Sequence, residues 1–140
     1  MKRIVELRER DGKRLEGIIL QEGRAATERR EVFAPKSVSW AASGIDIKDG
    51  HHGDSVAVAF PKRDTAGNIG VSIPLNPGLS AAFRRSGPGL SVEFVALEER
   101  STAGGIREIT KAYVDAAALV RNPEYTQAKA EIRKRRVKWL

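Results

Sequence analysis

The hexapeptide Gly-Leu-Ser-Val-Glu-Phe at residues 89–94 decides the fold prediction, because apolar and polar residues alternate in it with the period of a β-strand. Alternation sends its three apolar side chains to one face of the strand and Ser91 and Glu93 to the other. The glycine-rich turn at residues 86–89 precedes it. The sequence therefore predicts a strand with one apolar face and a serine on the opposite face.

Several further runs have the length and composition of strands, and turn residues separate them. They lie at residues 15–20, 56–60, 69–75 and 106–120. One helix is expected over residues 78–85, because Asn76 and Pro77 form a typical helix start. A second is expected from Pro123 to about Arg136, where apolar residues recur at helical spacing. These elements predict a mainly β, α+β protein.

The composition limits the class of protein. At 140 residues the chain is one domain's worth, and it contains no cysteine, which excludes disulfides and thiolate chemistry. No apolar run approaches the roughly 20 residues of a membrane span, and the first residues lack the apolar region of a signal peptide. We therefore expect a soluble protein without membrane contact that stays in the cell where it is made.

Positive charge is concentrated at the C-terminus. Residues 121–140 hold seven Lys or Arg against two Glu, a local charge of +5 out of a total of +7. The end of this segment, from Arg133 to Leu140, is expected to be a basic tail. It is either a solvated helix end or an appendage that binds an acidic partner or nucleic acid.

The chain has two histidines, His51 and His52, at a strand entrance. Adjacent strand residues point to opposite faces, so the pair is weak evidence for a metal site. A neutral imidazole is, however, a suitable base for a serine hydroxyl at physiological pH. The residue types alone leave two alternatives for His51 and Ser91: a catalytic pair, or two solvated side chains.

The order of these segments resembles the prohead maturation proteases of tailed bacteriophages, distant relatives of the herpesviral assemblins. Four segments carry the resemblance. They are Glu31–Pro35 with Val38 and Trp40, Gly50–Gly53 at the place of the histidine motif, Gly89–Phe94 at the place of the nucleophile strand, and Arg107–Ile109 through Leu119–Tyr125 as the closing strand.

The resemblance implies an antiparallel, assemblin-like strand barrel with a few peripheral helices, as a single domain over residues 1–132 followed by the basic tail 133–140. It implies a serine endopeptidase that needs no cofactor and acts in the host cytoplasm, inside the assembling prohead. Its substrates would be the scaffold or the scaffold-like arm of the major capsid protein, and also the protease itself. Two further partners are a second copy of the chain, in a homo-oligomer, and nucleic acid, which the charge of the tail could bind.

The same resemblance implies roles for individual residues. Ser91 would be the nucleophile and His51 the general base, with His52 at a variable position. Backbone amides near Ser91 or a cation such as Arg63 would stabilise the oxyanion.

The third catalytic residue departs from the family pattern. The position of the family's usual glutamate is occupied by Ala116. Asp115 is one residue away and is the expected substitute, provided that a bulge turns it to the correct face or that the alignment to the family shifts by one residue. Glu93 is the less favoured substitute, and a Ser-His dyad is the remaining alternative.

Two other functions remain alternatives. A non-catalytic capsid-assembly or head-structural protein that keeps the protease fold would explain the missing glutamate. A small basic nucleic-acid-binding module is disfavoured, since aromatic residues are few and the charge lies at one end.

Overall fold

The computed structural model describes residues 13–23, 25–26, 30–122 and 130–134. Their strands are β1 (Lys13–Gln21), β2 (Ala25–Ala26), β3 (Glu31–Phe33), β4 (Val38–Trp40), β5 (Ile45–Asp49), β6 (Ser55–Ala59), β7 (Lys62–Arg63), β8 (Asn68–Pro74), β9 (Gly89–Ser101), β10 (Arg107–Val120) and β11 (Ala130–Lys134). The helix within these residues is α2 (Pro77–Ser86). The prediction of a mainly β, α+β protein is confirmed.

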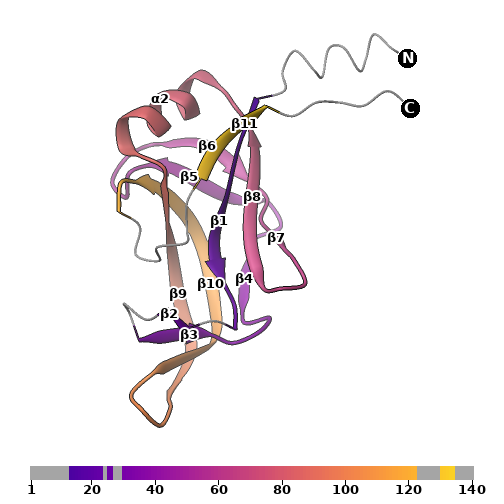
Figure 1. Ribbon diagram of the computed structural model, residues 1–140, viewed down its shortest axis with the longest axis vertical. Helices are drawn as coiled ribbons and strands as arrows, with labels where there is room; N and C mark the ends of the chain where they lie inside the picture. Colours follow the sequence, from indigo (N-terminus) through magenta and orange to yellow (C-terminus); the bar gives the residue numbers. More distant parts are fainter. Residues whose placement is uncertain (1–12, 24, 27–29, 123–129, 135–140) are drawn as a thin grey trace, which may run out of the picture.

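The strands form two hydrogen-bonded sheets (Figure 1). The smaller sheet has the order β11-β1-β8-β7, and the larger has the path β2-β3-β10-β5-β6, with β4 and β9 also paired to β10. Within the described residues no ladder joins these strands into one closed ring. The observed architecture is therefore two sheets.

The larger sheet is built around β10. Along one edge, β10 pairs antiparallel with β9, and along the other it pairs in parallel with β3, β4 and β5 in turn. The three short strands follow one edge of a single 14-residue strand because turns divide them, one at Lys36 (φ 60°) and one at Gly44 (φ 92°). These parallel pairings depart from the expected antiparallel arrangement.

One hydrophobic core lies between the sheets. Leu15 and Ile19 of β1 and Ile69 of β8 are buried in the same cluster as Leu90 of β9 and Leu119 of β10. Since side chains alternate along each strand, every one of these strands contributes one apolar face to this core. The opposite face of β9 carries Ser91 and Glu93, followed by the exposed apolar residues Val95 and Leu97.

Helix α2 begins as its sequence predicts. Asn76 is the N-cap, and its side-chain oxygen accepts a hydrogen bond from the backbone N–H of Leu79 at 2.7 Å. Leu79 and Ala82 are fully buried against the sheets. The helix ends at Gly87 (φ 110°), where a Cβ would lie 2.9 Å from the Cα of Arg121. Glycine is therefore required at the turn that leads into β9.

The prediction of a second helix, from Pro123 to about Arg136, is wrong for the residues of this range that the structure describes. Residues 130–134 form β11, which pairs antiparallel with β1, Ile132 lying opposite Leu15. The open edge of β1 offers hydrogen bonds that outweigh the helical spacing of this segment. The expected boundary between the domain and the basic tail at residue 132 thus falls inside a strand, and residues 135–140 lie outside the described residues.

Candidate active site

Strand β9 places two polar side chains next to the core. Leu90 and Val92 point into the core with 0% and 6% exposure, as the alternation predicts. Ser91 and Glu93 occupy the other face of the strand. On the neighbouring β10, their directly opposite residues are alanines at positions 118 and 116.

His51 lies on a tight turn that follows β5. The backbone N–H of Gly53 donates to the carbonyl of Gly50 at 3.1 Å, and that of Gly50 donates to the carbonyl of Leu119 on β10 at 3.1 Å. A Cβ on Gly53 would lie 1.8 Å from the carbonyl oxygen of Asp49. The turn therefore requires glycine and is hydrogen-bonded to the strand next to β9.

Asp49 ties the same turn to α2. Its carboxylate accepts hydrogen bonds from Arg85 and Ser86 at the end of the helix. These bonds, the one from Arg85 first, hold the pKa of Asp49 below its ordinary value. The histidine turn is thus fixed from two sides, by β10 and by α2.

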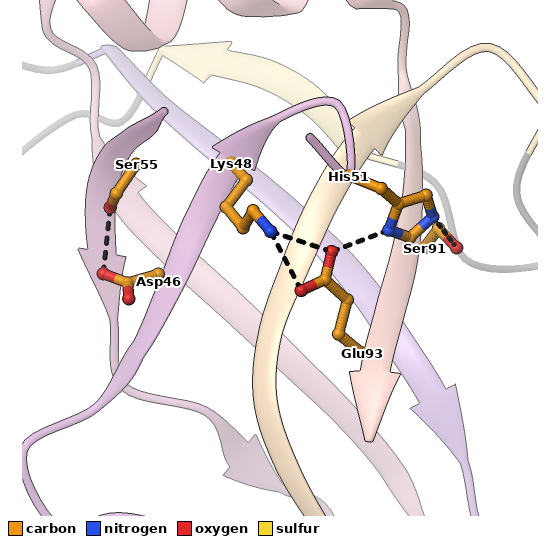
Figure 2. A network of polar contacts seen from close by, with 6 residues as sticks. All are labelled: Asp46, Lys48, His51, Ser55, Ser91 and Glu93. Carbon is orange, nitrogen blue, oxygen red and sulfur yellow. Dashed lines mark hydrogen bonds and ion pairs between the residues drawn. The ribbon is translucent and has the colours of Figure 1, made fainter. Parts of the chain in front are cut away.

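The imidazole of His51 lies between Ser91 and Glu93 (Figure 2). Its Nε2 is 3.0 Å from Ser91 Oγ, and its Nδ1 is 2.7 Å from Glu93 Oε2. A carboxylate only accepts, so the neutral ring carries its proton on Nδ1 and donates it to Glu93. Nε2 is then free to accept the proton of the Ser91 hydroxyl.

Glu93 also has a cationic neighbour. Nζ of Lys48 on β5 lies 3.1 Å and 3.3 Å from its two carboxylate oxygens. Burial alone would raise the pKa of Glu93, but the hydrogen bonds from His51 and Lys48 outweigh it, so the pKa lies below its ordinary value. The carboxylate is therefore ionised at neutral pH.

The three side chains differ in exposure. Ser91 is 3% exposed, whereas the side chains of His51 and Glu93 are 42% and 27% exposed. The serine is therefore buried, and the imidazole that contacts it is the most exposed of the three.

The structure brings together two of the three catalytic residues expected from the sequence, Ser91 and His51, and it places Glu93 rather than Asp115 on the histidine. Asp115 is exposed and lies where the register of β9 and β10 shifts, between Val114 and Ala116. Among the described contacts, none joins Asp115 to His51. The signal for Glu93 was available in the sequence, since it lies two residues from Ser91 on the same strand face.

Two other candidates lie apart from this line of contacts. The side chain of Arg63 forms a bidentate ion pair with Glu22, stacks over Trp40 and donates to the carbonyl of Val38. The Arg63 guanidinium is thus bound by other residues. Its contacts do not support the expected role of stabilising the oxyanion. His52 is exposed.

No three His, Asp or Glu side chains within the described residues are grouped so that they could hold a metal ion. No helix in the described part of the chain is long and apolar enough to cross a membrane. Comparisons of the chain with protein-family models, curated proteins and solved structures gave no match. Functional reasoning therefore starts from the contacts of Ser91, His51 and Glu93.

Proposed function

We propose that this protein is a serine endopeptidase. The observation that carries the proposal is the continuous line of hydrogen bonds from Ser91 through His51 to Glu93. Each group has the partner that its role in acyl transfer requires: a hydroxyl beside a ring nitrogen, and a carboxylate on the other nitrogen.

The chemistry follows from these positions. Ser91 Oγ attacks the carbonyl carbon of a peptide bond while His51 Nε2 takes its proton. The imidazolium is stabilised by Glu93 and gives that proton to the leaving amine, which leaves an ester on Ser91. Water, activated by the same imidazole, then hydrolyses the ester and restores the free hydroxyl.

The same face of β9 also offers surface for a polypeptide. Val95 and Leu97 continue the alternation of Ser91 and Glu93 and are 50% and 56% exposed. At about 3.3 Å per residue they lie about 13 and 20 Å along the strand from Ser91. An extended substrate with apolar side chains at such distances from the cut bond would cover both.

The resemblance to prohead maturation proteases extends this proposal to a substrate and a place. The substrate is the scaffold or the scaffold-like arm of the major capsid protein, and the site of action is the assembling prohead in the host cytoplasm. The assemblin-like barrel belongs to the same proposal: the mainly β composition with one shared core supports it, whereas the described strands form two sheets without closure. The parallel strands along β10 depart from its antiparallel form.

A second candidate is a non-catalytic capsid-assembly or head-structural protein with this fold. The 3% exposure of Ser91 favours it, since the histidine then simply satisfies a buried hydroxyl.

Co-expression with the cognate major capsid protein separates the two candidates. The mass of the capsid protein is measured with the wild type, with Ser91→Ala and with Ser39→Ala, a control on an exposed serine of β4. We expect a shortened capsid protein with the wild type and the control, and the full mass with Ser91→Ala. Equal masses in all three would reject the capsid-protein arm as the substrate. A fluorophosphonate probe that labels the wild type but not Ser91→Ala tests the nucleophile without any substrate, and equal masses together with no labelling would reject the protease proposal.

A further inference from the structure

Glu93 is held from two sides. One of its oxygens is 2.7 Å from His51 Nδ1, and both lie within 3.3 Å of Lys48 Nζ. The side chains of Lys48 and Glu93 are 24% and 27% exposed, so both are more than two-thirds covered. Lys48 is the one residue of this cluster that the sequence had not connected with catalysis.

The contact spans a whole strand. Lys48 lies on β5 and Glu93 on β9, and β10 runs between them (Figure 2). In the register, Ala118 lies between Lys48 and Ser91, and Ala116 lies between Asp46 and Glu93. Because both residues of the middle strand are alanines, the long lysine side chain can cross above them and reach the carboxylate.

We propose that Lys48 is a positioning residue, which holds the Glu93 carboxylate against Nδ1 of His51 and so aims Nε2 at the Ser91 hydroxyl. This inference rests on the proposed function, because an aimed base matters only if Ser91 is a nucleophile. Without the lysine, one face of the carboxylate loses its donor and the side chain can turn toward water. Water then competes with the Nδ1–H of His51 for the carboxylate oxygen.

The other charged side chains near Glu93 have partners of their own, so they do not hold its carboxylate. On the same strand, Asp46 accepts a hydrogen bond from Ser55 at 2.9 Å and is turned toward β6 (Figure 2). Arg85 is engaged by Asp49. Among the described residues, Lys48 is thus the cation in contact with Glu93, whose other side-chain partner is the imidazole of His51.

The test compares Lys48→Met, Lys48→Gln and Lys48→Arg in the full chain. We expect Lys48→Met to lower kcat about tenfold to a hundredfold with little change in KM, as for outer groups that orient a catalytic residue. Arginine also donates to both oxygens of a carboxylate, so Lys48→Arg should stay within a few-fold of the wild type. Lys48→Gln removes the charge and shortens the side chain by one atom, so it should also weaken the contact with Glu93 and lower kcat; it serves as the loss variant if Lys48→Met does not fold.

A second readout needs no substrate. A histidine Nδ1–H that donates to a carboxylate gives a proton resonance far downfield, and we expect it in the wild type and in Lys48→Arg but weakened or lost in Lys48→Met. An unchanged resonance in Lys48→Met, or its absence from the wild type, would overturn the inference. A resonance that depends on Lys48 in a protein without proteolytic activity would instead uphold the positioning role and reject the proposed function.

Discussion

Glu93 on β9 lies directly opposite Ala116 on β10. The resemblance to prohead proteases puts the supporting glutamate at the position of Ala116, and the structure has an alanine there with a glutamate facing it across the ladder. Directly opposite residues of an antiparallel pair have their Cβ atoms about 5 Å apart on the same face. A carboxylate from either strand can therefore reach the space beside His51.

The first prediction concerns the choice between two carboxylates. Glu93→Gln should lower kcat by about a thousandfold or more, because an amide can hold the wrong tautomer of the histidine. Asp115→Asn should leave kcat unchanged, since Asp115 is exposed and none of the described contacts joins it to His51. Cleavage rates of the two variants at saturating substrate measure the difference, and a large loss in Asp115→Asn alone would return the role to Asp115.

The second prediction uses the register between the strands. In the inactive Glu93→Ala variant, the further change Ala116→Glu should restore part of the lost activity, because the new carboxylate starts from the directly opposite position. The matched control adds Asp115→Glu to the same background and should restore nothing. If neither double variant recovers, the two positions are not interchangeable.

The third prediction concerns the turn that holds His51. Gly53→Ala should destabilise the protein by about 3 kcal/mol and reduce kcat, since the new Cβ would overlap the carbonyl of Asp49. Gly104→Ala is the control, because its Cβ meets nothing within 4 Å although its φ is 92°. It should cost only about 1 kcal/mol and leave kcat unchanged. Thermal unfolding and initial rates check both expectations.

The fourth prediction concerns the exposed apolar surface of β9. Under the proposed function, Leu97→Ser and Val95→Ser should raise KM for the proposed capsid-protein substrate several-fold and leave kcat nearly unchanged, because the substrate contacts that they would remove lie far from the reacting bond. Val58→Ser on β6 also removes an exposed apolar side chain, with 49% exposure, and serves as the control. An equal effect of all three would indicate a general loss of stability instead.

The fifth prediction links stability to pH through Glu22. This buried glutamate accepts hydrogen bonds from Arg63 and from the backbone of Val38. Burial acts to raise its pKa, but these bonds outweigh it, so the folded-state pKa lies below the ordinary value of 4.5. Its contribution to stability is therefore complete above about pH 4.5 and is lost as the pH falls through the folded-state value.

Replacing this carboxylate tests the sign. Glu22→Gln should cost about 3 kcal/mol at pH 7, because it leaves Arg63 without its charged partner, and stability should then fall less steeply in acid. Glu98→Gln breaks an exposed pair with Lys111 and should cost well under 1 kcal/mol. Urea unfolding at several pH values measures both variants, and parallel pH curves for Glu22→Gln and the wild type would contradict the linkage.

Local patterns predicted several elements correctly. The start of α2 followed from Asn76 and Pro77, and the buried residues of β8 followed from the alternation over residues 69–75. In both cases the determining interactions are between neighbours in the chain: a side-chain cap in one, and a side-chain period in the other. The segment at residues 130–134 was missed because its strand depends on β1, more than 100 residues earlier in the chain.

By itself, the sequence determined that β9 would have an apolar face and a face with Ser91 and Glu93, since strand geometry alone requires it. It also indicated a histidine as the candidate base, and the resemblance to prohead proteases favoured His51 over His52. Which carboxylate meets that histidine was decided by the tertiary structure. The register of β9 on β10 puts Glu93 opposite Ala116, the two alanines of β10 leave room for Lys48, and the turn anchored by Asp49 delivers the imidazole between them. These are contacts between strands distant in sequence, and no local pattern specifies them.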